Sequence, residues 1–148
     1  MESDFTLEGF IISTDKSMLD IARIHHYLSQ ESYWAQGRSL EIIQKSIANS
    51  LCFGVYNQGN QAGFARVVTD FATFAWLCDV FIMPEYRNRG LSKWLVQTIV
   101  NYPDLIGLRR FLLATRDAHQ LYAAYGGFKS LPNPERWMER FNPGIHTP

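Results

Sequence analysis

The sequence predicts an α/β domain in which a mixed β-sheet is covered by helices on both faces. Three observations support this. Short apolar segments of strand length alternate with segments in which apolar residues recur every three to four positions. Two of the apolar segments, 51–56 and 61–69, are separated by a polar turn, which is typical of an antiparallel hairpin. A third, 73–83, is followed by a helical segment and another strand, and such a βαβ unit pairs its strands in parallel.

The strands are predicted from short apolar runs bounded by turn residues. In chain order they cover residues 10–13, 51–56, 61–69, 73–83, 110–115, Phe128 and 136–141, the last two closing the sheet. Segment 73–83 is long and apolar throughout, so we expect it to be central and covered on both faces. Pro84 ends it, because proline cannot donate to a sheet ladder. Segment 110–115 is expected to be another buried strand.

Four helices are predicted from apolar periodicity and from residues that begin or end helices. Two lie between the first and second strands, one follows strand 73–83, and one follows strand 110–115. The third helix begins at Leu91. The residues expected to cap or stop the helices are Ser17, Ser39, Pro103, Asp117, Gly126 and Gly127.

Composition limits the functions to consider. The chain has 148 residues, of which 47% are hydrophobic, so we expect one domain over 1–148 with a core at about 10–141. The formal net charge is zero, whereas nucleic-acid binders usually carry a basic excess, so no nucleic-acid partner is expected. No apolar run approaches the ~20 residues of a membrane span, and residues 1–10 are acidic rather than basic. We therefore expect a cytoplasmic protein without a membrane partner.

The cysteines indicate neither a disulfide framework nor a metal centre. Cys52 and Cys78 lie in apolar runs without a Cys or His partner at metal-ligand spacing. No pair of histidines has such spacing either. We expect both thiols to be free and buried in a reducing compartment, and we expect no metal.

The loop before the third helix carries the strongest functional signal. A helix N-terminus presents unpaired amides and the positive end of a dipole, which together bind phosphate oxygens. Gly90 permits a positive φ or a close backbone approach, and Arg87 and Arg89 add positive charge. The loop lacks the Gly-Lys-Ser/Thr of a Walker A motif and the three glycines of a dinucleotide fingerprint. Taken alone, Gly90 favours an ordinary turn with solvent-facing arginines, because one glycine after a strand is a weak signal.

Two motifs make the interpretation more specific. The segment Val80-Phe81-Ile82-Met83-Pro84-Glu85-Tyr86-Arg87-Asn88-Arg89-Gly90-Leu91-Ser92 resembles the acetyl-CoA-binding motif of the GNAT family of N-acetyltransferases, with Ser92 in place of the usual glycine or alanine. The segment Leu121-Tyr122-Ala123-Ala124-Tyr125-Gly126-Gly127-Phe128 resembles the second signature of that family, with one additional glycine. The predicted order of elements is similar to the family's fold over about 10–141.

The resemblance implies an enzyme that moves an acetyl group from acetyl-CoA to a primary amine of a small molecule or a protein by direct attack. The backbone of strand residues near 80–83 would hold the pantetheine arm. The cofactor-binding residues implied are Val80, Phe81, Ile82, Arg87, Asn88, Arg89, Gly90, Leu91, Ser92 and Tyr122. The alternative is a non-catalytic acyl-CoA sensor of the same fold.

Acetyl transfer to an amine needs proton transfers, and two residues are candidates for them. Tyr122 stands where similar enzymes carry a tyrosine close to the CoA sulfur, so it is the candidate acid for the leaving thiolate. It could instead pack its helix on the sheet. Asp79 is the candidate base, since an acid in an apolar strand is costly unless paired or functional. A structural pairing with Arg66 on the neighbouring strand is the alternative.

The acceptor region is expected in the segment between the first two helices. Similar proteins line the acceptor site there, and this segment holds Tyr33, Trp34 and Arg38. The aromatic side chains could form a wall for an amine, and Arg38 could hold a carboxylate. They could equally pack the loop against the body. The many aromatic residues would also permit a homodimer.

Overall fold

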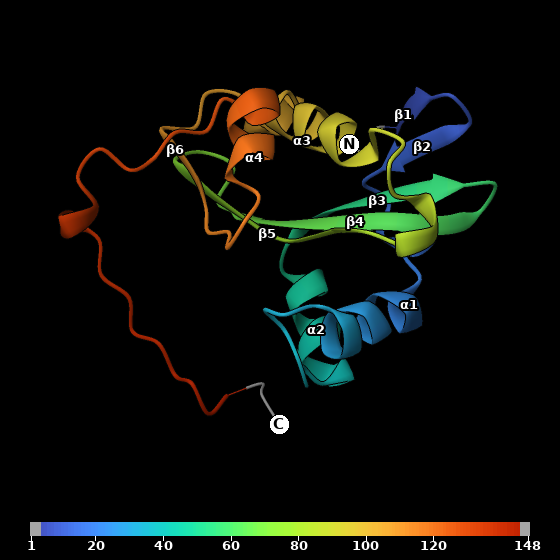
Figure 1. Ribbon diagram of the computed structural model, residues 1–148, viewed down its shortest axis with the longest axis horizontal. Coiled ribbons are helices and arrows are strands. Elements are labelled where there is room, and N and C mark those ends of the chain that lie inside the picture. Colours follow the sequence, from blue (N-terminus) through green and yellow to red (C-terminus); the bar gives the residue numbers. More distant parts are fainter. Residues whose placement is uncertain (1–3, 146–148) are drawn as a thin grey trace.

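The computed structural model describes residues 4–145, which form a six-stranded sheet with helices on both faces (Figure 1). The strands are β1 (Asp4–Leu7), β2 (Phe10–Ser13), β3 (Leu51–Asn57), β4 (Asn60–Thr69), β5 (Phe74–Ile82) and β6 (Arg110–Leu113). They lie in chain order across the sheet. Neighbouring strands are antiparallel except for β5 and β6, which are parallel. The predicted mixed sheet is therefore confirmed.

The helices divide between the two faces of the sheet. They are α1 (Ile21–His26), which continues into a π-helical turn (Tyr27–Glu31), α2 (Leu40–Ala48), α3 (Leu91–Val100) and α4 (His119–Gly126). Figure 1 shows α1 and α2 on one side of the sheet and α3 and α4 on the other. Among the described residues no helix is both long and apolar enough to cross a membrane.

Each face of the sheet has its own buried core. On the α3 side, Leu95 and Ile99 belong to one cluster with Phe53 of β3. On the α1 side, Ile24 belongs to a second cluster with Phe64 of β4. Large apolar side chains are therefore removed from solvent on both faces of the sheet, which stabilises each layer by roughly 1.5–3 kcal/mol per buried residue. The loops at one end of the sheet are positioned by these two cores.

The predicted caps are partly right. Ser39 caps α2, because its hydroxyl accepts a hydrogen bond from the backbone N–H of Ile42 at 3.2 Å. Gly127 ends α4 with a left-handed φ of 72°. Ser17 does not begin a helix, since its own N–H and hydroxyl donate to Asp15.

Helices α1 and α4 begin at caps other than those predicted. The cap of α1 is Asp20, whose carboxylate accepts from the N–H of Arg23. Asp117 is not the cap of α4, which starts after Ala118. The carboxylate of Asp117 accepts instead from Arg116 at 3.3 Å.

The ends of the sheet differ from the prediction. Strand β1 was not predicted, and it joins β2 through a tight turn in which Glu8 and Gly9 have φ values of 47° and 86°. No closing strand forms at Phe128 or over 136–141 within the described residues 4–145. Phe128 instead follows the end of α4, with its N–H donating to the carbonyl of Tyr122 at 3.2 Å and its ring packed edge-on against Phe111.

Strand β5 lies next to the sheet edge rather than at its centre. Its Phe74 and Trp76 are exposed, so the prediction of a strand covered on both faces is wrong for its first half. Strand β6 forms the edge, and none of its four residues is buried, although three are apolar. In the last half of β5, Asp79, Phe81 and Ile82 are buried and Val80 is half-buried, and this part borders the candidate site.

Candidate active site

One cavity of about 1000 Å³ gathers almost all the residues predicted for the site. Its walls are the second half of β5, the loop and first turn of α3, the loop between α1 and α2, and the segment from the end of β6 to α4. The predicted residues that line it are Tyr33, Trp34, Arg38, Asp79, Val80, Phe81, Ile82, Arg87, Asn88, Gly90, Leu91, Ser92 and Tyr122. Arg89 lies outside it, with its guanidinium 6.0 Å from the ring centre of Tyr86.

Strand β5 departs from regular geometry where it meets the cavity. Its register with β4 shifts between Phe64 and Arg66, and Asp79 has a left-handed φ of 54°. This is a β-bulge, which leaves one residue without a ladder partner. Parallel pairing with β6 ends at Leu77, so the β6-facing edge of β5 borders the cavity from Cys78 onward. Backbone groups of this strand are therefore available to a ligand.

The loop before α3 presents backbone amides to the cavity. Asn88 and Gly90 have positive φ values of 65° and 77°, and Gly90 is the N-cap of the ten-residue helix α3. A Cβ on Gly90 would meet no atom of the protein within 4 Å, so the glycine serves the backbone conformation. The first-turn amides of Leu91 and Ser92 then lie at the positive end of the helix dipole. This arrangement can hold phosphate oxygens.

The side chain of Arg87 braces the site. Its Nε donates to the carbonyl of Ile82 at 3.0 Å, and its Nη2 donates to the hydroxyl of Tyr27 at 2.8 Å. The ring of Tyr27 stacks on Phe81 with centroids 4.0 Å apart. Arg87 thus ties the end of β5 to the helical layer on the α1 side of the sheet.

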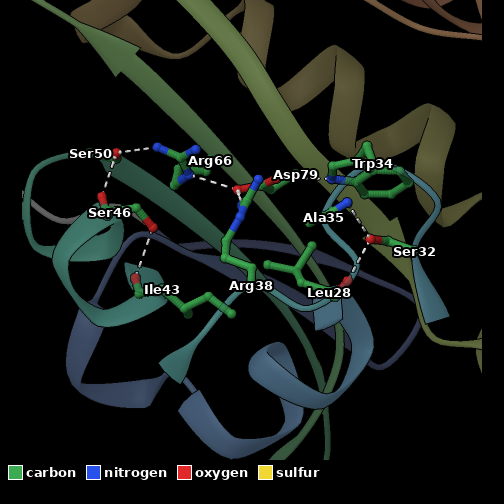
Figure 2. Close-up of polar contacts among 10 residues, drawn as sticks. All are labelled: Leu28, Ser32, Trp34, Ala35, Arg38, Ile43, Ser46, Ser50, Arg66 and Asp79. Atoms are coloured by element: carbon green, nitrogen blue, oxygen red, sulfur yellow. Dashed lines mark hydrogen bonds and ion pairs between the residues drawn. The ribbon is translucent and has the colours of Figure 1, made fainter. Parts of the chain in front are cut away.

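A buried ion cluster lies at the bulge, and Figure 2 shows its members converging on Asp79 from β4 and from the loop between α1 and α2. One oxygen of Asp79 accepts from Nε of Arg66 at 2.8 Å and from Nη1 of Arg38 at 2.9 Å. The other accepts from the indole N–H of Trp34 at 2.9 Å. The pairing with Arg66 that the sequence left open is therefore present, and two further donors join it.

The cluster extends to α2. Nη1 of Arg66 donates to the hydroxyl of Ser50 at 3.1 Å, and that hydroxyl donates to the carbonyl of Ser46 at 2.6 Å (Figure 2). The role of Ser50 was not predicted, because nothing in its sequence neighbourhood distinguishes it from an ordinary serine. The chain of bonds connects the floor of the cavity to the end of a helix, which restricts the rotamer of Arg66.

Tyr122 is buried on α4 and faces the cavity. Burial, together with a smaller effect of the neighbouring Tyr33, raises the pKa of its phenol to about 12. The phenol is therefore protonated at neutral pH. A protonated hydroxyl in this position can donate a proton or a hydrogen bond to a group that gains negative charge.

Tyr33 joins two loops across the cavity. Its hydroxyl accepts from the backbone N–H of Arg116 at 3.0 Å, and the guanidinium of Arg116 lies 3.9 Å from its ring centre. Trp34 packs edge-on against Tyr33, with centroids 5.1 Å apart. Arg116 was not predicted, because its contact with Tyr33 spans 83 residues and leaves no local signal.

Two other lining residues were missed or misjudged. Trp76 of β5 lines the cavity and is partly exposed, although apolar strand residues usually indicate core. Cys52 is buried as expected, but Cys78 is only half-buried and lines the cavity. Burial raises the pKa of the Cys78 thiol to about 12, so the thiol stays protonated at neutral pH.

Comparison with known proteins identifies the fold and the class of enzyme. Residues 21–128 match the Acetyltransferase (GNAT) family, and this stretch contains both helical layers and the whole cavity. The chain belongs to the GNAT family. It is therefore an acyltransferase by family, and the resemblance seen in the two sequence motifs is confirmed.

Relatives of this GNAT protein agree with the assignment. A family member from Xanthomonas campestris pv. campestris is 50% identical, with a TM-score of 0.91 over 97% of this chain and 100% of that one. The protein FG08082 of Gibberella zeae, which carries the name of an acetyltransferase, is 28% identical over 85% of this chain and 82% of its own. A Clostridium acetobutylicum protein solved with acetyl-CoA shares the fold, with a TM-score of 0.62, 13% identity and coverage of 95% and 96%.

Proposed function

We propose that the protein transfers an acetyl group from acetyl-CoA to a primary amine by direct attack. The observation that carries the proposal is the convergence of three parts on one cavity: the amides at the start of α3, the bulged end of β5, and the buried hydroxyl of Tyr122. A phosphate-bearing thioester needs an anion site, a strand edge for its amide groups, and a proton donor near its sulfur. Candidates for all three line one cavity of about 1000 Å³, which supports the proposal.

The donor side of the cavity is the loop before α3. Asn88 and Gly90 shape the loop, and the amides of Leu91 and Ser92 would bind the pyrophosphate without a Walker lysine. The exposed ammonium of Lys93 also lines the cavity and adds positive charge. Backbone groups of Val80 to Ile82 would then hold the pantetheine arm along the open edge of β5. The related Clostridium acetobutylicum protein was solved with acetyl-CoA, which supports the choice of donor.

Tyr122 is the proposed acid. The thiolate of CoA gains charge as the tetrahedral intermediate collapses, and a phenol with its pKa raised to about 12 remains protonated to meet it. Its burial limits contact of the phenol with water, which strengthens a hydrogen bond that the hydroxyl makes. The alternative role of packing is compatible with this one, since the ring also contacts Phe128.

For Asp79 we propose a positioning role in place of the general base. Both carboxylate oxygens already accept hydrogen bonds, from Arg38 and Arg66 on one side and from Trp34 on the other. Three fixed donors therefore occupy acceptor positions of this carboxylate, which leaves it little room to approach an amine proton. Its hydrogen bonds with Trp34 and Arg38 fix the loop between α1 and α2 against the bulge of β5. The amine would then lose its proton to solvent before it attacks the thioester.

The acceptor enters on the side of Tyr33, Trp34 and Arg38. Tyr33 and Trp34 are partly exposed aromatic rings at the cavity wall, which suits an amine approaching with an apolar body. Arg38 is largely buried and already paired with Asp79, so it contributes mainly to the shape of this wall.

Thermal unfolding with acetyl-CoA, CoA and ATP, followed by thiol release over a panel of amines, tests the proposal. A ligand at 100 times its Kd stabilises the protein by about 2.7 kcal/mol, so both CoA species should raise the Tm by several degrees. If ATP raised the Tm and neither CoA nor acetyl-CoA did, the proposal would be excluded. Binding of CoA without turnover on any amine would instead favour the non-catalytic sensor.

A further inference from the structure

The C-terminal arm, residues 129–145, carries apolar side chains that the rest of the chain does not cover and that are exposed to solvent. Every residue from 134 to 145 is exposed. Met138 is 96% exposed and Phe141 is 72% exposed, and Trp137 and Ile145 are also exposed. Figure 1 shows this red segment leaving the body near β6 and following an open path away from the sheet. Exposed apolar side chains grouped in one segment mark an interaction surface.

The same chain has an uncovered apolar surface beside the base of the arm. Val68, Trp76 and Leu112 lie side by side on β4, β5 and β6, so their side chains point to one face of the sheet. Val68 is 39% exposed and Trp76 36% exposed, and Phe74 of the same face is exposed as well. We call these four residues the open row. Helices α1 and α2 cover this face of the sheet but leave the open row in contact with solvent.

The outer edge of β6 is also available. β6 is the last strand of the sheet, and within residues 4–145 its backbone pairs only with β5. The arm touches the start of β6, where the guanidinium of Arg110 lies 5.4 Å from the ring centre of Trp137. A hollow of about 290 Å³ separates the two segments there. An apolar strand with a free edge and space beside it is a template for another strand.

We propose that the protein forms a two-fold dimer in which the C-terminal arm of each chain docks on the β6 edge and open row of the other. A two-fold axis repeats each contact, so a single interface would bury both C-terminal arms and both open rows. Each chain offers the arm and the surface that would receive it, which makes a second copy the fitting occupant.

Charge and area both favour a second copy. The chain has zero formal net charge, and residues 134–145 of the arm balance Glu135 and Glu139 with Arg136 and Arg140, so two copies do not repel each other strongly. An aromatic side chain buries roughly 150–250 Å². Met138 and Phe141 of each arm are largely exposed, Trp137 and Ile145 are partly exposed, and with the receiving surface of each chain they supply the apolar area from which a stable interface of ~1,200 Å² is built. Because Trp76 also lines the cavity, a docked arm would border the acceptor side of the partner's site.

The test is the mass of the full chain in solution, measured by sedimentation equilibrium from about 1 to 100 μM. The wild-type chain should have twice the mass of one copy. The double variant Met138→Asp with Phe141→Asp should weaken dimerisation by at least ~100-fold, as loss of a central apolar contact does. Both side chains are exposed in the single chain, so the variant should keep its far-UV circular dichroism and its Tm at low concentration.

Two single variants complete the design. Val68→Asp changes the receiving surface outside the cavity and should also shift the mass toward one copy. Leu7→Asp is the matched control, because Leu7 is 40% exposed on β1 at the opposite edge of the sheet, and it should leave the dimer intact. A wild-type chain that stays monomeric at 100 μM would overturn the proposal, since the arm would then be free or folded on its own chain. The proposal would also be overturned if the chain dimerised equally well in the Met138→Asp with Phe141→Asp variant and in Val68→Asp. Neither result depends on the proposed acetyl transfer.

Discussion

The carboxylate of Asp79 accepts a hydrogen bond from Nε of Arg66 at 2.8 Å, and Asp79 is itself the residue at which β5 adopts a left-handed φ of 54°. Left-handed backbone costs about 1–2 kcal/mol for a residue with a Cβ, although aspartate tolerates it better than most. The ion pair offsets this cost and holds the bulge in place. The strand that borders the cavity therefore takes its shape from a contact between two neighbouring strands.

Replacing Asp79 by Asn should destabilise the protein by about 3 kcal/mol. The variant leaves Arg38 and Arg66 as two nearly buried cations without a counter-ion, and breaking a buried pair from one side typically costs 3–5 kcal/mol. Urea unfolding followed by circular dichroism measures the change. We also expect Asp79→Asn to keep the acidic-limb pKa of the wild-type pH–rate profile, because a positioning residue does not take the proton. Loss of that limb would restore Asp79 as the base.

A double-mutant cycle with Arg66→Gln separates this interaction from general damage. If the pair acts as described, the double variant should be more stable than the sum of the two single changes predicts, by about 1–3 kcal/mol. Purely additive losses would show that Asp79 and Arg66 contribute independently.

Tyr122→Phe should lower kcat by roughly 100-fold or more at saturating acetyl-CoA, because general acid catalysis typically contributes 10²–10⁴. The ring stays in place, so its contact with Phe128 and the stability of α4 should persist. Steady-state thiol release measures the rate. The control is Tyr125→Phe on the same helix, since that ring lies against Lys93 and outside the cavity. Equal rates for wild type and Tyr122→Phe would leave the tyrosine with a packing role only.

The pH dependence of kcat should show no basic limb below about pH 10. The pKa of Tyr122 is raised to about 12, so its acid form is present throughout the neutral range and is lost only as pH rises through that value. A free amine forms as pH approaches its own pKa of about 10.4, so the rate should climb toward that pH. The raised pKa also stabilises the fold below pH 10, and that contribution is lost between about 10 and 12. A basic limb near pH 8 that disappears in Tyr122→Phe would contradict this assignment.

Local sequence signals were sufficient for the elements that position the donor site. Apolar periodicity and Pro103 defined α3, and Gly90 indicated the positive φ that its N-terminus adopts. The β5–α3–β6 unit followed from the order of segments, because parallel strands need a crossover. These features depend on residues close together in the chain, which is why a single sequence reveals them.

Features that depend on distant residues were not predicted correctly. The closing strands failed because 136–141 has strand-like composition but finds no partner within residues 4–145 of its own chain. The contact of Tyr33 with Arg116 and the link from Arg66 to Ser50 join segments that no spacing rule connects. For Asp79, the sequence indicated a functional or paired acid but could not show that three donors already occupy it.

Gly90→Ala should weaken CoA binding by about tenfold or more while changing stability only modestly. Gly90 has a φ of 77°, and a Cβ there would meet no protein atom within 4 Å, so the direct cost is backbone strain of about 1–2 kcal/mol. Relief of that strain would rotate the amides of Leu91 and Ser92 away from the cavity. The protein would then remain folded but lose its phosphate site. Isothermal titration with CoA measures the affinity, and thermal unfolding measures the stability.

Gly107→Ala is the matched control for this change. Gly107 has a φ of 91° and equally open surroundings, but it lies outside the cavity. Both variants should lose a similar amount of stability because they carry the same kind of strain. Only Gly90→Ala should lose affinity for CoA. If both variants bound CoA as the wild type does, the phosphates would lie elsewhere in the cavity, since the strained amides of the α3 loop could not then be their ligands.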